Sequence, residues 1–223
     1  MQKIIFILLI LIQVDTFSQK TEVTIYESNK RIDTKYSNSK IQSKEQANKH
    51  WLDLIGKGYL NASIDSLNLN DSLHHKIYID KGNKIIVDKI ISNIPTSIKS
   101  EIGFKENLIL NKGFSSYKLI ELIETTLDYC NNNGHPFALI KLNESKLTGQ
   151  TIYLDIKLNL GPLITVDSII LPPELTDQKK IIQQIINIQK GDLYNQKLIN
   201  SISTRIKETP FLTELSYPEY EFI

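Results

Sequence analysis

Apolar residues recur along this chain at two different spacings, which predict both helices and strands. Helical spacing is clearest at Leu119, Leu122, Ile123, Leu127 and Cys130, which fall at i, i+3, i+4, i+8 and i+11 and form one stripe. Asn131 to Gly134 predict the end of that helix, because Asn and Gly tolerate the left-handed conformation of a helix C-terminus. Residues 152–158 instead alternate between apolar and polar side chains, the pattern of a strand with one buried face.

Similar stretches recur at nearly constant offsets, which indicates an internal repeat. Residues 82–90 (GNKIIVDKI) match residues 161–169 (GPLITVDSI) at an offset of 79, and both predict a turn followed by a strand. Lys112-Gly113 matches Lys190-Gly191 at an offset of 78, between two predicted helices. Gly134-His135-Pro136-Phe137 resembles Glu208-Thr209-Pro210-Phe211 at an offset of 74, after a helix and before a strand. The repeated unit is therefore strand, helix, helix, strand, strand.

The first copy of this unit is weakest at its beginning. Residues 23–25 predict an initial strand, but residues 28–44 are polar and are predicted to hold little structure. A helix around Trp51 follows, then a strand over Tyr59–Leu69 and a neighbouring strand around residues 77–79. The first copy is thus predicted to resemble the others only in its second half.

The third copy begins like the second and stops earlier. Its predicted elements are a strand at Leu163–Leu171, helices at Asp177–Ile188 and Asn195–Lys207, and an extended segment from Phe211. The sequence reaches Ile223 without a counterpart of the alternating strand at residues 152–158. The third unit is therefore predicted to be incomplete.

Together these elements predict an α+β fold. Each strand has one apolar face and each helix one apolar stripe, so the economical packing lays two helices over one side of a small mixed three-stranded sheet. We expect a first unit over residues 19–82 with an irregular N-terminal part, a complete second unit over 83–161, and a third over 162–223 without its last strand. Turns between the elements are assigned to Gly58, Gly82, Gly134, Pro136, Gly161, Pro162 and Gly191.

The first 18 residues predict a secretory signal peptide. Lys3 supplies positive charge, residues 4–12 form an unbroken apolar run, and small residues at Thr16 and Ser18 favour cleavage before Gln19. A membrane anchor is the alternative, but nine residues at helical rise cover less than half of the roughly 30 Å hydrocarbon core. We therefore expect an exported protein that resides in the periplasm.

Composition and candidate chemistry argue against an enzyme. Basic side chains number 26 and acidic ones 25, which gives no sign of nucleic-acid or anionic-membrane binding. Cys130 is the one cysteine and continues the apolar helix stripe, so we expect a buried thiol rather than a nucleophile. His74 and His75 are adjacent, and neighbouring side chains on a strand point to opposite faces, which disfavours a shared metal. Nucleophile-elbow and phosphate-loop motifs are absent, so no catalytic, metal or cofactor-binding residue is predicted.

The repeat resembles a known family. Its order of elements over about 75 to 80 residues, with NGHPF at 133–137, GPLITVD at 161–167 and KGDLYN at 190–195, is similar to the POTRA domain of outer-membrane assembly factors of the BamA and TamA type. The resemblance covers residues 45–223. In that family several POTRA units precede a C-terminal β-barrel, and we expect this chain to lack the barrel.

The resemblance implies binding of unfolded outer-membrane or secreted polypeptides, and of periplasmic assembly partners, by strand addition at an exposed sheet edge. The implied edge is the strand after the helix-ending glycine, with candidate residues Tyr59, Ala62, Ile64, Phe137, Leu139 and Lys141. Lys141 and Asn143 are expected to face solvent as gatekeepers. Two alternatives stay open: a free-standing periplasmic adaptor that uses the same edges, and a truncated, inactive fragment of an outer-membrane barrel protein.

Overall fold

The computed structural model describes residues 20–214 and 216–223. The predicted signal peptide, with its cleavage site at Ser18 and Gln19, lies outside the described residues. The chain divides into two compact units: one holds the chain up to Ile55 together with Asn61–Gly82, and the other holds Gly56–Leu60 together with Asn83–Ile223. The predicted boundaries after residues 82 and 161 stay predictions.

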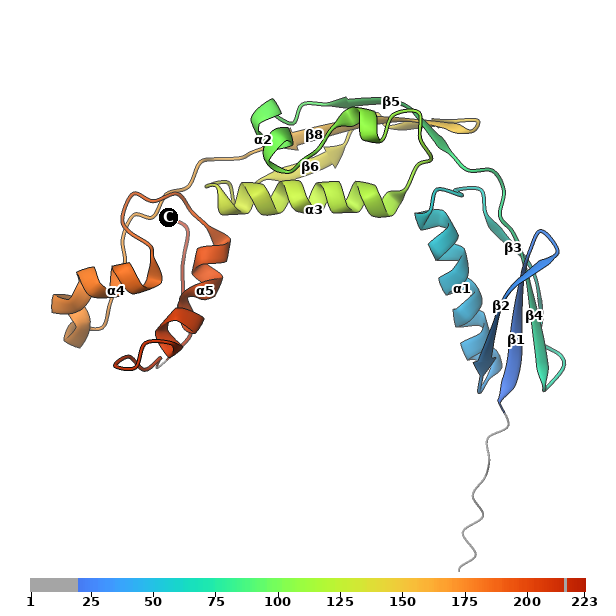
Figure 1. The fold of residues 1–223 in the computed structure, drawn as a ribbon, viewed down its shortest axis with the longest axis horizontal. Helices are drawn as coiled ribbons and strands as arrows, with labels where there is room; N and C mark the ends of the chain where they lie inside the picture. The colour runs from blue at the N-terminus through green and yellow to red at the C-terminus, as the bar shows by residue number, and fades with distance from the viewer. Residues whose placement is uncertain (1–19, 215) are drawn as a thin grey trace, which may run out of the picture. The chain divides into compact units, whose positions relative to one another are not determined.

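From residue 20 onward, the first compact unit contains a four-stranded sheet and one helix (Figure 1). Its elements are β1 (Thr21–Glu27), β2 (Lys30–Ser37), α1 (Lys40–Gly56), β3 (Ser63–Asn68) and β4 (His74–Asp80). The strand order is β2-β1-β4-β3, with β1 and β4 parallel and each outer strand antiparallel to its neighbour. The core is formed by the buried residues Val23, Ile25, Ala47, Leu54, Ile77 and Ile79.

Residues 28–44 form regular structure, so the prediction of little structure there is wrong. Ser28 and Asn29 have positive φ angles of 46° and 66°, which close a two-residue hairpin between β1 and β2. Ser39 Oγ then accepts a hydrogen bond from the Gln42 N–H at 3.1 Å and caps α1. The initial strand predicted at residues 23–25 is β1, which forms a hairpin with β2, and the sheet has four strands instead of the predicted three.

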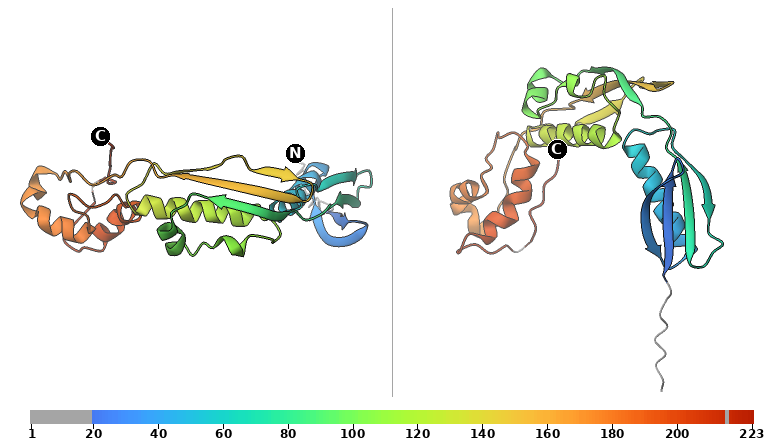
Figure 2. Two further views of the ribbon diagram at one scale, coloured as in Figure 1. Left: turned by 90° about the horizontal axis from the view of Figure 1, so that it is seen from above. Right: turned by 45° about the vertical axis from the view of Figure 1, so that its right-hand side comes forward.

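The predicted second unit contains a mixed sheet with two helices (Figures 1 and 2). Its elements are β5 (Ile86–Ser92), α2 (Thr96–Glu101), a 3-10 turn (Glu106–Leu108), α3 (Ser116–Asn132), β6 (Leu139–Leu142), β7 (Lys146–Thr148) and β8 (Thr151–Asn159). The sheet order is β5-β8-β6, and β8 is parallel to β5 but antiparallel to β6 and to the short β7. The α+β prediction is confirmed here.

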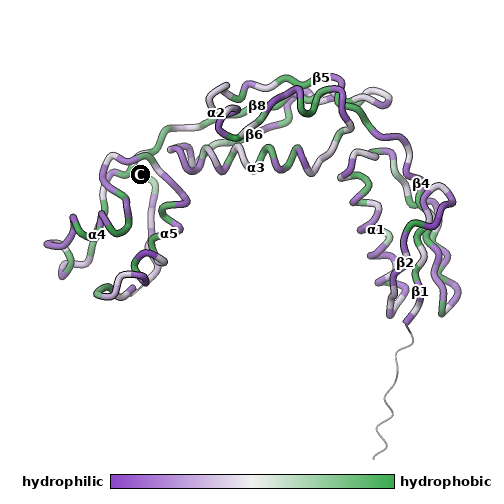
Figure 3. The backbone as a smooth tube through the Cα atoms, viewed as in Figure 1, coloured by the Kyte–Doolittle hydropathy of each residue, from purple (hydrophilic) through white to green (hydrophobic). Residues whose placement is uncertain are grey.

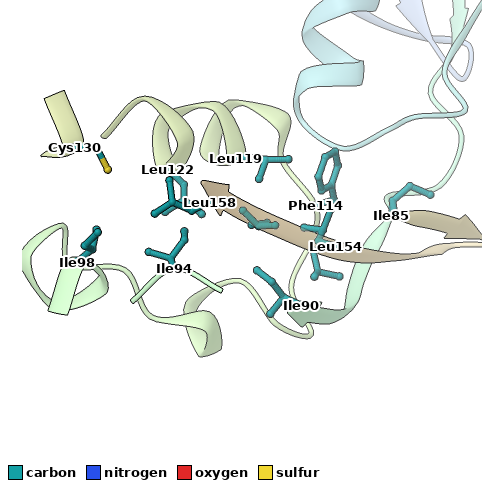
Figure 4. Packing of buried hydrophobic residues seen from close by; sticks show 12 residues of the cluster. Ile85, Ile90, Ile94, Ile98, Phe114, Leu119, Leu122, Cys130, Leu154 and Leu158 are labelled. Atoms are coloured by element: carbon teal, nitrogen blue, oxygen red, sulfur yellow. The ribbon is translucent and has the colours of Figure 1, made fainter. Parts of the chain in front are cut away.

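The core of this second unit lies between the sheet and its helices (Figure 4). Alternate residues of β8, namely Leu154, Ile156 and Leu158, are buried against the stripe of α3, which Figure 3 shows as alternating apolar and polar positions. Ile98 of α2 joins the same cluster. Cys130 is buried in it as predicted, and burial raises the pKa of its thiol, so the thiolate is disfavoured.

The described residues after Gly161 form helices without a regular strand. The helical elements are a 3-10 turn (Pro173–Gln178), α4 (Lys179–Ile186) and α5 (Gln196–Lys207). The helix predicted from Asp177 begins later because the 3-10 turn precedes it, and it ends where Asn187 adopts a left-handed φ of 57°. The helix predicted at Asn195–Lys207 is confirmed, with Asn195 as its N-cap.

The strand predicted at Leu163–Leu171 is absent, so that prediction is wrong. One isolated bridge joins Thr165 to Leu193. In the second unit β5 forms a ladder with β8, whereas the described residues after 161 supply no equivalent partner, and a strand needs a paired neighbour. Ile170 is consequently 91% exposed.

Candidate strand-addition edge

β6 lies at an open edge of the second unit's sheet, since the strand order ends with it. β5 lies at the opposite edge, but a loop covers its beginning. The Val87 N–H donates to the Lys112 carbonyl at 2.9 Å, and the Asn111 N–H donates to the Val87 carbonyl at 2.8 Å. The edge formed by residues 139–142, here called the open edge, is therefore the better site for another strand.

Alternation along β6 decides which backbone groups face outward. The Asn143 N–H donates to the Asp155 carbonyl at 2.8 Å, so residues 139, 141 and 143 direct their N–H and C=O groups towards β8. The hydrogen bonds of β8 are consistent with this assignment. The Ile156 carbonyl faces β5, because it accepts a hydrogen bond from the Asn93 N–H at 3.3 Å, so the backbone groups of Ile156 do not pair with Leu142. Ile140 and Leu142 therefore direct their backbone groups away from β8, to the side where a further strand pairs.

The same two residues expose apolar surface at the open edge. Ile140 lies opposite Leu158 and Leu142 opposite Ile156, so both side chains point to the helix side of the sheet. Leu142 is nevertheless 46% exposed, because β6 ends the sheet. A strand added here covers apolar area as well as backbone groups.

The family resemblance implied an edge that ends at Leu142, and the residues singled out on it were Leu139 and Lys141 rather than these two. Leu139 lies opposite Asn159 and Lys141 opposite Lys157, so both side chains lie on the face away from α3. Their backbone groups face β8. Ile140 and Leu142 lie within that edge but were not chosen, because a four-residue strand does not reveal its buried face. The buried face of β6 becomes clear only from its register against β8.

A bulge ends the open edge after Leu142. Residues 143–145 separate β6 from β7, although both strands pair with β8. Asn143 Nδ2 donates to Asp155 Oδ2 at 3.1 Å, and the Asp155 N–H donates to Ser145 Oγ at 3.1 Å. The hydrogen bond from Asn143 holds the pKa of Asp155 below its ordinary value. Asn143 is exposed, as expected of a gatekeeper, and it also fixes the bulge.

The first unit has two sheet edges of different character. β2 carries the charged residues Lys30, Arg31, Asp33 and Lys35, which discourage pairing with another chain. β3 is less charged, and Ile64 lies opposite Ile79 while Leu67 lies opposite Ile77, on the buried side of the sheet. Leu67 is partly exposed there. β3 therefore resembles β6, and the predicted residue Ile64 lies on it.

Two other predicted edge residues lie off β3. Ala62 precedes the strand and is buried, and its carbonyl accepts a hydrogen bond from Trp51 Nε1 at 2.8 Å. Tyr59 belongs to the other compact unit, where the Lys84 ammonium lies 5.7 Å from its ring centroid. The strand predicted at Tyr59–Leu69 is thus shortened, because these residues have other partners.

Phe137 lies at the entrance of the open edge. It follows Pro136 in a turn that closes where the Ala138 N–H donates to the His135 carbonyl at 3.2 Å. The Phe137 ring is 49% exposed, and its centroid lies 4.7 Å from that of Phe222. The predicted residue is therefore next to β6 rather than on it.

A hydrogen-bonded junction precedes the second unit's sheet. The Ile85 N–H donates to the Gly58 carbonyl at 2.9 Å, and the Phe114 N–H donates to the Ile85 carbonyl at 2.7 Å. Ser115 is the N-cap of α3, and its hydroxyl also donates to the Gly56 carbonyl at 3.3 Å. The strand, the loop and the helix start are thus fixed to one another.

The same bonds recur at a second junction, after α3. The Ile164 N–H donates to the Gly134 carbonyl at 2.8 Å, and the Tyr194 N–H donates to the Ile164 carbonyl at 2.9 Å. Asn195 is the N-cap of α5, and its Nδ2 donates to the Asn132 carbonyl at 2.8 Å. The repeat in the sequence is therefore a repeat of backbone pairing.

The predicted turn glycines shape these junctions. Positive φ angles occur at Gly58, Gly82, Gly134, Gly191 and Gly161, which Pro162 follows. At Gly134 φ is 88°, and a Cβ added there would lie 2.7 Å from Leu163 Cδ1. A side chain at this position would therefore disturb both the turn and the packing.

His74 and His75 have structural partners. His75 is buried and its Nδ1 lies 2.7 Å from Ser43 Oγ, whereas the exposed His74 has its Nδ1 3.4 Å from Asp71 Oδ2. Within the described part of the chain, no three His, Cys, Asp or Glu side chains are grouped to hold a metal. Among residues 20–214 and 216–223, no helix is both long and apolar enough to span a membrane.

Solved structures resemble this chain, although no protein-family model and no curated protein matches it. The structure titled BamA POTRA3-5, from Haemophilus influenzae, is 14% identical, with a TM-score of 0.48 and 89% of each chain covered. The N-terminal domain of Omp85 from the thermophilic cyanobacterium Thermosynechococcus elongatus is 12% identical, with a TM-score of 0.31 and 84% of each chain covered.

The predicted order of elements is complete in the second unit. β5, α2, α3, β6 and β8 follow one another as strand, helix, helix, strand, strand, and residues of both helices join the core under the mixed sheet. This order and pairing of elements is the one predicted for the repeated unit. Within this fold the last strand is central and the strand before it is at the edge, so the open edge follows from the topology.

Proposed function

We propose that this chain is the periplasmic POTRA-like region of an outer-membrane protein assembly or translocation factor, and that it binds unfolded polypeptides by β-strand addition. The open edge carries the proposal. Ile140 and Leu142 combine outward backbone groups with apolar side chains at the end of the sheet. An extended segment pairs with such an edge through its own backbone, so many client sequences are acceptable.

The size of the open edge favours transient binding. Ile140 and Leu142 each offer one N–H and one C=O, and a backbone hydrogen bond contributes about 1 kcal/mol net. A client strand therefore gains about 4 kcal/mol from backbone pairing, and ordering of the client offsets part of that gain. Weak, reversible pairing suits a factor that passes a client onward, and it requires no catalytic residue.

β3 provides a second candidate edge of the same kind. Ile64 and Leu67 lie on the buried side of its sheet, as Ile140 and Leu142 do on theirs. The bulge at Asp65 interrupts its pairing with β4, so β3 offers a less regular edge than β6. We therefore expect the open edge of β6 to bind clients more strongly than β3.

Photo-crosslinking tests the proposal directly. A photo-reactive amino acid at Leu142 is expected to capture a urea-unfolded outer-membrane barrel protein after dilution into buffer. The matched control is Ile120 on α3, which is 48% exposed and equally apolar. Equal capture at Ile120, or no capture at Leu142, contradicts strand addition at β6.

A further inference from the structure

Four aromatic rings from distant parts of the sequence form one cluster at the entrance of β6. The Phe222 ring centroid lies 4.7 Å from that of Phe137 and 5.5 Å from that of Tyr194. The Tyr220 centroid lies 6.0 Å from that of Tyr194 and 5.7 Å from that of Phe222. The rings are tilted or edge-on to one another, which are favourable geometries for aromatic pairs.

Two of these rings are held by backbone hydrogen bonds, Tyr194 by those of the second junction and Phe137 by the turn before β6. Tyr194 is buried, its N–H donates to the Ile164 carbonyl, and its carbonyl accepts from the Gly134 N–H, both at 2.9 Å. Gln196 adds a polar group, because its Oε1 accepts a hydrogen bond from the Tyr194 hydroxyl. Phe137, Tyr194 and Gln196 are here called the aromatic site.

The other two rings belong to the segment Ser216–Ile223. Tyr220 and Phe222 are two residues apart, so an extended chain carries both rings on one side. The Tyr220 hydroxyl donates to Gln196 Oε1 at 3.4 Å. Tyr220 is 52% and Phe222 43% exposed, so each ring is only half covered. The segment therefore occupies the aromatic site through two half-exposed rings and one hydroxyl.

The aromatic site is next to the open edge. Phe137 precedes Leu139, the first residue of β6, by two positions. A polypeptide whose rings contact Phe137 and Tyr194 is therefore within a few residues of the backbone groups of Ile140 and Leu142. Because Ser216–Ile223 occupies the aromatic site, such a polypeptide must displace it.

We propose that the aromatic site selects extended polypeptides with aromatic residues at alternate positions, and that Ser216–Ile223 is an internal occupant that these clients displace. The inference rests on the proposed function, since backbone pairing by itself does not distinguish one client from another. Ring pairs contribute beyond the area that they bury, so two rings correspond to about a tenfold preference over serine at the same positions.

Peptide binding to the chain without its predicted signal peptide, residues 19–223, tests the aromatic site. The probe is a fluorescent peptide with the sequence of residues 216–223, and its control has serine at both ring positions. The double variant Tyr220→Ser/Phe222→Ser vacates the site, so the probe is expected to bind this variant about tenfold more tightly than it binds the unaltered chain. Equal binding to both chains, or equal binding of the serine peptide, overturns the proposal.

A third substitution, added to the Tyr220→Ser/Phe222→Ser variant, tests whether the probe binds at the aromatic site. Phe137→Ser is expected to weaken probe binding about tenfold, whereas Phe211→Ser, at a ring that is 71% exposed, is expected to leave it unchanged. Phe137→Leu retains an apolar side chain and gives the same comparison if the serine variant is unstable. Equal loss with Phe211→Ser, or no loss with either Phe137 variant, overturns the proposal.

Capture of an unfolded client at Leu142 separates this proposal from strand addition. If aromatic-rich and aromatic-poor clients are captured equally, and Phe137→Ser changes neither, the aromatic site is overturned and strand addition stands. If the probe depends on Phe137 while no client is captured at Leu142, strand addition is overturned and the aromatic site stands.

Discussion

Proline at Leu142 removes one outward N–H of the open edge and leaves the bonds to β8 in place. Residues 139, 141 and 143 direct their N–H groups to β8, whereas that of Leu142 points away from it. Proline is tolerated on an edge strand when its missing N–H faces solvent, and the preceding Lys141 is already extended. Leu142→Pro is therefore expected to keep the fold and weaken client binding.

The magnitude follows from one lost hydrogen bond. A net contribution of about 1 kcal/mol corresponds to about a fivefold weaker Kd. Leu142→Ser removes the same apolar side chain but retains the N–H, so the difference between the proline and serine variants isolates the backbone donor. Lys141→Pro is the opposite control, because its missing N–H belongs to the ladder with β8 and leaves a carbonyl unpaired, at about 1–3 kcal/mol of stability.

Two assays on the same samples measure the changes in client affinity and in stability. Fluorescence anisotropy with a labelled unfolded client measures affinity, and thermal unfolding measures stability. We expect Leu142→Pro to lower affinity relative to Leu142→Ser with little change in Tm, and Lys141→Pro to lower Tm by several degrees. Equal client affinity of the Leu142→Pro and Leu142→Ser variants, both folded, would refute the assignment of outward groups.

Three further predictions concern stability. Gly134→Ala is expected to destabilise the second compact unit by roughly 1–3 kcal/mol in urea unfolding, because φ is 88° and a leucine methyl lies 2.7 Å from the added Cβ; Gly149→Ala, with nothing within 4 Å, should cost less. Asn195→Ala is expected to cost about 1 kcal/mol, whereas Asn195→Ser should restore the cap of α5, and equal losses for both would contradict the capping role. Burial by itself would raise the pKa of the Glu27 carboxyl. Hydrogen bonds from His50, at 2.8 Å, and from Lys81, at 3.3 Å, outweigh burial and hold that pKa below its ordinary value. The ionised Glu27 therefore stabilises the fold above a pH of about 4, and this stabilisation is lost as the pH falls further. Glu27→Gln should accordingly reduce the loss of unfolding free energy on acidification, and an unchanged dependence of unfolding free energy on pH would contradict this.

Elements with strong local signals could be predicted from the sequence. The stripe from Leu119 to Cys130 is α3, and the alternation at residues 152–158 is β8, because each pattern reflects burial of a long element by itself. The repeat also placed α5 correctly. Local chemistry was overlooked at Ser28 and Asn29, where two non-glycine residues at positive φ close a hairpin, and at the Ser39–Gln42 cap of α1.

Features that depend on distant partners could not be predicted in this way. Leu163–Leu171 has the composition of a strand, but strand formation requires a paired neighbour that the described residues do not provide. The topology places β6 at a sheet edge, while the outward direction of Ile140 and Leu142 depends on the register of β6 against β8, which the sequence of β6 does not reveal. The contact between Phe137 and Phe222 joins positions 85 residues apart and has no local signal.

Amide hydrogen exchange at the open edge, followed by NMR with and without an unfolded outer-membrane client, tests strand addition most directly. The N–H groups of Ile140 and Leu142 point away from β8, so they are expected to exchange rapidly in the free chain and to become protected when the client pairs with β6. The amides of Leu139 and Lys141 face β8 and should change little. Protection that appears on α3 while Ile140 and Leu142 continue to exchange rapidly would contradict binding at this edge.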